Sequence, residues 1–460
     1  MARNTQVPAD HNAPAVTQIL AQFVATHPSR GWSDAVDHEA HRTLMNWVGC
    51  AVGAVHHEAP RAAIAAAMVL QSAPQASVLG SSTKLDMASA ALVNGISSHT
   101  FDFDDTHLKT IIHPAGPVAS AALAMAEHIG SKGRELIDAL VIGIDVSCRV
   151  GNAMYPEHYD RGWHITGSTG TLGAAAACAR LLKLDVQQTA MALGIAASQP
   201  VGMREQFGTM TKPFHPGGAA RAGLVSALLA QQGFTASPKA LEAPRGMMQT
   251  ISTKNDWSEI THELGQRFEI SFNSYKPFAC GIVIHPSIDA CSQLRAQFAA
   301  ASIGLDQIER VELKVHSLVL ELTGKKEPAD GLQAKFSVYH GCAAGLIFGR
   351  AAEEEFADDI VNRPDMLALR RKVVAVVDDR IDEASADVTA VLKDGQKIHI
   401  FVKHAIGSLE NPMTDALLEG KFHGLADAVM GAEKTSALIK ACWAVGGAAD
   451  VKGLARAACA

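Results

Sequence analysis

Excess charge, aromatic residues and long apolar runs are all scarce in this 460-residue chain. Forty basic residues stand against 47 acidic ones, which gives a net charge of −7, and aromatic residues make up only 5%. A nucleic-acid binder needs a concentrated positive face or aromatic stacking platforms, so we expect no nucleic-acid partner. No stretch approaches the roughly 20 apolar residues that span a bilayer, so we expect no membrane partner either.

Paired cysteine motifs are missing as well. The eight cysteines are scattered, and none forms a Cys-x-x-Cys pair. This spacing does not support a zinc ribbon or an iron–sulfur site. The N-terminus is polar and lacks the apolar core of a secretory signal. We therefore expect reduced, buried thiols and a cytoplasmic protein.

Helical spacing dominates from about residue 14 to 265. Apolar residues recur at i, i+3, i+4 and i+7 in residues 14–27, 41–57 and 135–154. Many of these runs are rich in alanine, which favours close helix packing. The same periodicity returns after Pro412, at the start of a final helical segment. The pattern predicts a large all-helical domain over residues 1–265, joined by residues 406–460.

A different pattern begins near residue 266. Apolar and polar residues alternate over residues 267–275, 308–324, 372–383, 386–395 and 397–404, and Asp394-Gly395 is a hairpin-turn dipeptide. Helical runs lie between them, at 285–300 and 335–349. We predict a smaller α+β domain over residues 266–405. The fold class is therefore mainly α with a smaller α+β domain.

The densest polar segment is SHTFDFDDTHLKTIIHPAGP, residues 98–117. It is interpreted in three ways: a solvated loop that caps the helix near Pro117, a transition-metal site built from carboxylates and imidazoles, or a metal-free acid–base loop. An EF-hand does not fit, because the sixth and twelfth positions counted from Asp102 are His107 and His113. The metal-free interpretation is favoured.

The segment GWHITGSTGTLG, residues 162–173, places His164 before a run of small residues. A helix that begins here would offer unpaired N–H groups to an anion, with His164 as an acid or base. The alternative is structural, with Gly170 and Gly173 serving close helix packing. A dinucleotide-binding turn does not fit, because no strand precedes it.

Two further segments offer cations and imidazoles. One is TKPFHPGGAARAG, residues 211–223, and the other is SFNSYKPFACGIVIHPSIDA, residues 271–290. The candidates are Lys212 and His215 in the first, and Tyr275, Lys276, Cys280 and His285 in the second. No nucleotide loop, GxSxG elbow or HExxH helix accompanies them. This set of residues favours an enzyme that transfers protons to or from a small polyanionic substrate. A carboxylate-binding protein and a metal-dependent hydrolase are the alternatives.

Taken together, the four segments resemble the MmgE/PrpD family, as do KFSVYH at 335–340 and NPMTDALLEGKF at 411–422. The resemblance implies a large all-α domain with a smaller α+β lid, a homodimer, a small di- or tricarboxylate substrate, and no metal or organic cofactor.

The resemblance also implies roles for particular residues. Asp102, His113, His164, Lys212 and Lys276 match catalytic positions of the family. The two lysines would stabilise an enolate-like state, and the two histidines would act as acid and base. Thr106 also matches an active-site position of the family. From the residues themselves, substrate contacts are expected from Thr106, Arg149, His215, Tyr275, Cys280 and His285.

The expected reaction is a dehydration like that of 2-methylcitrate dehydratase. The alternatives are an epimerase of an iminodisuccinate-like substrate and a cis-aconitate-type decarboxylase. The family decarboxylase has a histidine five residues after the lid lysine, where this chain has Gly281. The spacing from Thr106 to His113 also differs by one residue. These departures count against decarboxylation and weaken the match to methylcitrate dehydration.

Overall fold

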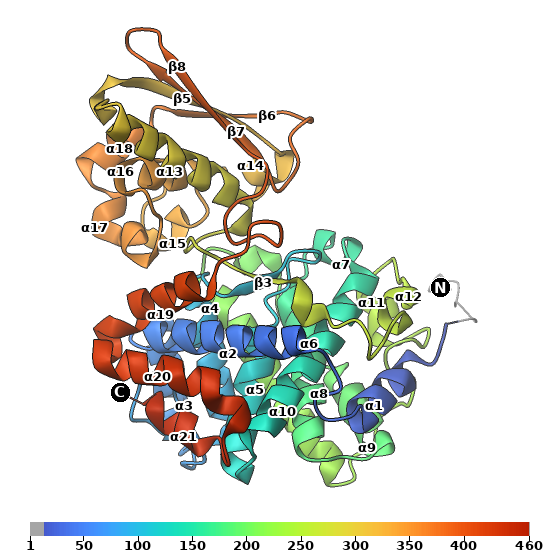
Figure 1. Ribbon diagram of the computed structural model, residues 1–460. Coiled ribbons are helices and arrows are strands. Elements are labelled where there is room, and N and C mark those ends of the chain that lie inside the picture. Colours follow the sequence, from blue (N-terminus) through green and yellow to red (C-terminus); the bar gives the residue numbers. More distant parts are fainter. Residues whose placement is uncertain (1–12, 460) are drawn as a thin grey trace. The chain divides into compact units, whose positions relative to one another are not determined.

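A computed structural model describes residues 13–459, and these divide into two compact units. Unit 1 comprises residues 13–100, 104–273 and 415–459, and unit 2 comprises residues 101–103 and 274–414. Unit 1 is helical, and unit 2 combines helices with a four-stranded sheet (Figure 1). The predicted fold class, mainly α with a smaller α+β part, is confirmed.

Unit 1 is built from helices and a two-stranded ribbon. The helices are α1 (Val16–Thr26), α2 (Asp34–Ala54), α3 (Glu58–Val69), α4 (Met87–Thr100), α5 (Ala115–Ile129), α6 (Gly133–Met154), α7 (Glu157–Asp160), α8 (Ile165–Leu181), α9 (Val186–Ala196), α10 (Thr211–Gln231), α11 (Met247–Ile251), α12 (Trp257–Thr261), α19 (Asp415–Met430), α20 (Ala432–Ala444) and α21 (Lys452–Ala457). The ribbon pairs β1 (Ala76–Ser77) with β2 (Lys84–Leu85), and β3 (Asp105–His107) precedes α5.

Helix α8 lies at the centre of unit 1 and is buried along its length except at Arg180. Small residues allow this burial. A Cβ on Gly170 would lie 2.5 Å from Pro117 Cγ of α5, and a Cβ on Gly173 would lie 2.6 Å from the Gly143 carbonyl oxygen of α6. The packing interpretation of these two glycines is therefore confirmed. The helix expected in this segment is α8, which begins at Ile165 directly after His164.

Unit 2 carries a mixed sheet in the order β6-β5-β7-β8. The strands are β5 (Ile308–Val315), β6 (Val373–Val377), β7 (Ala386–Leu392) and β8 (Lys397–Val402), and the helices are α13 (His285–Ala300), α14 (Ser317–Thr323), α15 (Gly331–Ala334), α16 (Val338–Phe348), α17 (Asp358–Val361) and α18 (Pro364–Arg370). β5 pairs in parallel with β6 and antiparallel with β7, through Val311↔Val373 and Leu313↔Val388.

One face of this sheet is covered by helices. Val311, Leu313, Val315 and Val388 alternate with more exposed residues and are fully buried, and α13 and α16 pack on the sheet (Figure 1). The predicted hairpin joins β7 to β8 at Gly395, whose φ of +90° suits glycine.

Two predicted strands are wrong over part of their length. Residues 269–272 form a 3₁₀ turn before the short strand β4 (Asn273–Tyr275). Residues 317–323 form α14, because the His316 side chain accepts a hydrogen bond from the Leu318 amide at 3.3 Å and caps the helix. Val319 and Thr323, four residues apart, then bury the same helix face. Within residues 13–459, no helix combines the length and apolar character needed to cross a membrane.

Candidate active site

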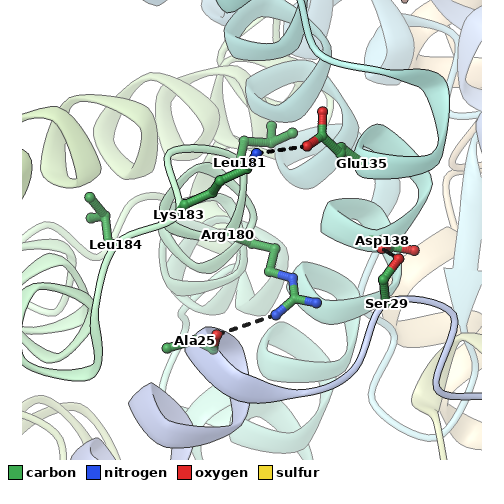
Figure 2. A pocket seen from close by; sticks show the side chains of 8 residues that line it. All are labelled: Ala25, Ser29, Glu135, Asp138, Arg180, Leu181, Lys183 and Leu184. Atoms are coloured by element: carbon green, nitrogen blue, oxygen red, sulfur yellow. Dashed lines mark hydrogen bonds and ion pairs between the residues drawn. The ribbon is translucent and has the colours of Figure 1, made fainter. Parts of the chain in front are cut away.

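A cavity of about 290 Å³ in unit 1 is bounded by α1, α6 and α8 (Figure 2). Its charged groups serve the fold. Arg180 donates to the carbonyl oxygens of Val24 at 3.0 Å and His27 at 2.6 Å, and Lys183 pairs with Glu135 at 3.1 Å. Arg180 lies at the opposite end of α8 from His164, about 24 Å away along the helix, and none of the described residues that line this cavity is a candidate site residue.

The polar segment after α4 is buried. Asp104, Asp105, Thr106 and His107 are all inaccessible to solvent, so the solvated-loop interpretation is wrong. Burial is compensated by internal hydrogen bonds: the Asp105 carboxylate accepts from the Asn273 amide at 2.8 Å and from the Ala115 backbone N–H at 3.1 Å. Burial, together with the nearby Asp104 carboxylate, raises the pKa of Asp105 to about 7.

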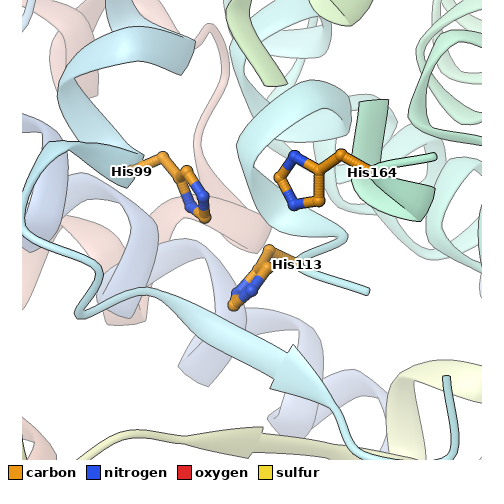
Figure 3. Close-up of side chains that lie close together, drawn as sticks. All are labelled: His99, His113 and His164. Atoms are coloured by element: carbon orange, nitrogen blue, oxygen red, sulfur yellow. The ribbon is translucent and has the colours of Figure 1, made fainter. Parts of the chain in front are cut away.

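Three histidines converge here, and two of them, His99 and His113, belong to the polar segment at 98–117 (Figure 3). His99 lies in the last turn of α4, His113 precedes α5, and His164 is the N-cap residue of α8. The ring centroid of His99 lies 4.7 Å from that of His113 and 5.8 Å from that of His164. His215, from the first turns of α10, adds a fourth ring, with 2.8 Å between its Nδ1 and Nδ1 of His164. We call His99, His113, His164 and His215 the histidine cluster.

Hydrogen bonds hold the rings of the histidine cluster. His99 Nδ1 lies 2.7 Å from the Asp104 carboxylate. His113 Nδ1 donates to the Asp105 carbonyl oxygen at 2.8 Å and lies 3.3 Å from Thr106 Oγ1. The Thr106 hydroxyl therefore contacts a candidate catalytic imidazole and helps to hold the His113 ring in place.

Electrostatics keep part of the cluster neutral. Burial, followed by the neighbouring His99, His215 and Lys212, lowers the pKa of His164 well below its usual value. Burial also lowers the pKa of His215 to about 4. At neutral pH both rings are unprotonated, so each has a lone pair available as a base or for the hydrogen bond between them. Lys212 stands at the start of α10, and its ammonium nitrogen lies 5.4 Å from the centroid of the Phe207 ring.

A second cluster lies within unit 2. The buried Lys276 ammonium donates to the Asp102 carboxylate at 2.7 Å and to the Asp102 carbonyl oxygen at 3.0 Å. Asp102 has a φ of +52°, an unusual backbone conformation for a residue with a side chain. Lys335 donates to the preceding carbonyl, of Phe101, at 2.7 Å and pairs with Glu353. Two buried lysines thus hold the segment that carries Asp102.

The other candidates of unit 2 are buried near the start of α13. Tyr275 ends β4, and His285 begins α13 with its ring 5.3 Å from that of Phe278. His285 Nε2 lies 3.4 Å from the Cys280 carbonyl oxygen. Burial raises the pKa of the Cys280 thiol to about 12, so this thiol is protonated at neutral pH and is not a nucleophile there.

Arg149 does not fit the expected substrate contact. Its fully buried guanidinium pairs with Asp145 at 2.7 Å and donates to the carbonyl oxygens of His262 at 2.9 Å and Arg267 at 2.5 Å. The donors of this side chain hold α6 against the segment after α12. The prediction that Arg149 binds substrate is therefore wrong, and its role is structural.

Sequence reasoning did not single out His99, Asp104 and Asp105. All three stand in the polar segment at 98–117, where other residues of the same types, such as His107, have an equally polar sequence environment. The structure separates them: the two ring nitrogens of His107 contact Thr110 at 2.8 Å and Glu269 at 3.1 Å. His107 thus serves the fold, whereas His99 faces the other histidines.

Comparison with known proteins gives matches along most of the chain. The model of the MmgE/PrpD N-terminal domain matches residues 18–260, and that of the MmgE/PrpD C-terminal domain matches residues 278–445. A cis-aconitate decarboxylase-like protein, oryM, of Aspergillus oryzae is 27% identical over 95% of this chain and 96% of its own length.

Two further relatives have narrower coverage. The cis-aconitate decarboxylase of Homo sapiens is 28% identical over 76% of this chain and 75% of its own length. The 2-methylcitrate dehydratase of Salmonella typhimurium is 22% identical over 74% of this chain and 73% of its own length.

Proposed function

The chain belongs to the MmgE/PrpD family, and from that premise we propose that it is a lyase that acts by acid–base chemistry beside a carboxylate of a small di- or tricarboxylate. The observation that carries the proposal is the histidine cluster with Lys212 at its edge. Buried imidazoles with fixed orientations suit proton transfer, and a nearby ammonium suits a carboxylate or an enolate-like state.

The proposed reaction is a dehydration. The imidazole of His164, which its lowered pKa keeps neutral, takes the proton from the carbon beside a carboxylate. The electron pair left on that carbon forms the double bond as the C–O bond to the neighbouring hydroxyl breaks. His113, in its protonated form, supplies the proton with which the hydroxyl leaves as water. Lys212 would stabilise the negative charge that develops on the carboxylate side.

Asp102 and Lys276 of unit 2 are proposed as further catalytic residues. Their side chains form a buried ion pair, and both match positions that the resemblance assigns to catalysis. We further propose a homodimer that works in the cytoplasm without a resident cofactor. The eight cysteines are all free thiols, which suits a reducing compartment.

Decarboxylation of a cis-aconitate-like substrate is the second candidate. It is favoured by the names of the relatives, among which cis-aconitate decarboxylases match more of the chain than the 2-methylcitrate dehydratase. Against it stands Gly281, which lacks the imidazole that the family decarboxylase has at this position. A Cβ there would lie 3.3 Å from Thr323 Cγ2, so the Thr323 side chain would have to move by a few tenths of an ångström.

Proton NMR in deuterated water tests both candidates. The chelator-treated protein is offered citrate, 2-methylcitrate, cis-aconitate, trans-aconitate and iminodisuccinate separately. A vinyl signal that appears from citrate or 2-methylcitrate indicates dehydration. Replacement of the vinyl signal of an aconitate by other vinyl signals, with release of carbon dioxide, indicates decarboxylation. Deuterium uptake with inversion indicates an epimerase. No change with any of them, together with tight binding of one, indicates a carboxylate-binding protein.

Variants connect the reaction to the site. His164→Ala and Lys212→Ala should each abolish most turnover while the far-UV circular dichroism spectrum stays that of the wild type. His262→Ala, at a side chain that is 66% exposed, is the matched control and should keep full turnover. Wild-type turnover in His164→Ala or Lys212→Ala would remove that residue from the mechanism.

A further inference from the structure

We propose that His99, His113 and His164 form a binding site for a divalent transition-metal ion such as Zn²⁺, and that the bound ion inhibits the enzyme. Each ring offers one ligand nitrogen, and the three nitrogens lie within 4.8 Å of one another (Figure 3). All three residues are buried. They come from the end of α4, the loop before α5 and the N-cap of α8, so the site depends on three separate segments.

The surroundings of the three rings match those of metal-binding histidines. Such histidines use their second ring nitrogen to donate a hydrogen bond to a carboxylate or a backbone carbonyl, which fixes the ring. Here His99 Nδ1 contacts the Asp104 carboxylate at 2.7 Å, and His113 Nδ1 contacts the Asp105 carbonyl oxygen at 2.8 Å. Nδ1 of His164 contacts His215 at 2.8 Å.

An unsatisfied nitrogen gives independent support. His99 is 1% exposed, and its Nε2 is buried without a hydrogen-bond partner. A buried polar atom of this kind destabilises the fold when it stays unpaired. Because Nδ1 of the same ring is held by Asp104, Nε2 is the atom that can bind an ion, and coordination would satisfy it.

The ligand set selects the class of ion. Imidazole nitrogens suit zinc, copper, nickel and iron, whereas magnesium and calcium prefer oxygen. Zinc–nitrogen bonds of about 2.0–2.1 Å in a tetrahedral site place the ligand nitrogens about 3.3 Å apart. Small rotations of the three side chains would close the separation from 4.8 Å or less to that value. The fourth tetrahedral position would stay open to water or a carboxylate.

Inhibition rests on the proposed function, because it follows only if His113 and His164 transfer protons. A lone pair that binds zinc cannot take a proton from substrate, so the ion and the acid–base reaction compete for the same two rings. Metal binding by itself does not rest on the proposed function, because it requires only the three imidazoles.

Zinc titration of the chelator-treated full-length protein tests the site. We expect one ion per chain by calorimetry, and an X-ray absorption spectrum with three imidazole nitrogens at about 2.0–2.1 Å. His99→Ala should weaken binding at least 100-fold, and Asp104→Asn about 10- to 100-fold through the ring that it orients. The exposed-site control His262→Ala should bind as the wild type does.

Several results would overturn the proposal: no stoichiometric binding, sulfur ligands in the spectrum, or wild-type affinity in a folded His99→Ala. If that variant does not fold, the ligand spectrum of the wild type decides alone. Turnover is then measured with and without one equivalent of zinc. Tight binding with unchanged turnover overturns the inhibition, whereas a protein that turns over none of the substrates but binds zinc refutes only the proposed function.

Discussion

Removing the Lys276 ammonium should destabilise unit 2 more than removing both charges of its ion pair. Lys276 is 1% exposed and Asp102 is 4% exposed, with 2.7 Å between Nζ and Oδ1. Breaking a buried pair by removing one partner leaves an uncompensated charge and costs about 3–5 kcal/mol. Lys276→Met should therefore cost this amount, whereas Asp102→Asn with Lys276→Met should recover most of it, because no buried charge is left unpaired.

The readout must report unit 2. All five tryptophans lie in unit 1, so tryptophan fluorescence does not follow unfolding of the smaller unit. Hydrogen exchange of the backbone amides in β5 and β7 follows it directly. A loss of 3–5 kcal/mol corresponds to a fall in protection of roughly 100- to 5,000-fold in Lys276→Met, at 1.36 kcal/mol per tenfold change. The double variant should keep most of the wild-type protection.

Turnover separates the structural role of the pair from its proposed catalytic role. The double variant should be stable yet inactive, because it lacks both groups proposed to take part in the reaction. If its amides in β5 and β7 exchange as fast as those of Lys276→Met, the uncompensated charge is not what destabilises the single variant. If the double variant is active, Asp102 and Lys276 leave the mechanism.

Three further predictions concern stability. Arg149→Leu should lower the free energy of unfolding of unit 1 by about 3–5 kcal/mol, because the buried Asp145 loses its ion-pair partner. Urea denaturation followed by tryptophan fluorescence measures this loss, and a variant that is stable but has a raised KM would instead indicate that Arg149 contacts substrate. Burial lowers the pKa of His340 to about 4, so between pH 7 and pH 5 the unfolded chain takes up a proton that the folded chain does not. The free energy of unfolding of unit 2, measured by hydrogen exchange, should therefore fall by about 2 kcal/mol from pH 7 to pH 5. His340→Gln should remove that part of the pH dependence. An unchanged pH dependence in this variant would contradict the lowered pKa of His340. Gly173→Ala should cost about 1–3 kcal/mol and lower the Tm, because the added methyl meets the facing carbonyl of α6 at 2.6 Å; an unchanged Tm would show that the helices can separate.

Local sequence patterns determined the fold class of this protein. Helical periodicity before residue 265 and alternation after it follow from side-chain directions along a helix or a strand, which depend on neighbours in the chain. The hairpin at Gly395 follows in the same way from its turn residues. The pattern was wrong at residues 317–323, where the His316 cap and one buried face favour a helix over the strand that the alternation predicts.

The sequence also identified three of the four members of the histidine cluster, His113, His164 and His215, and Lys212 near them, because these residues stand in unusual polar or glycine-rich segments. Only the tertiary structure decided which of them meet. It brought His99 to His164, 65 positions along the chain, and it bound Arg149 to Asp145 and backbone carbonyls instead of leaving it for substrate. Packing of small residues along α8 sets these distances, and burial sets the protonation of the rings, so neither could be read from spacing in the chain.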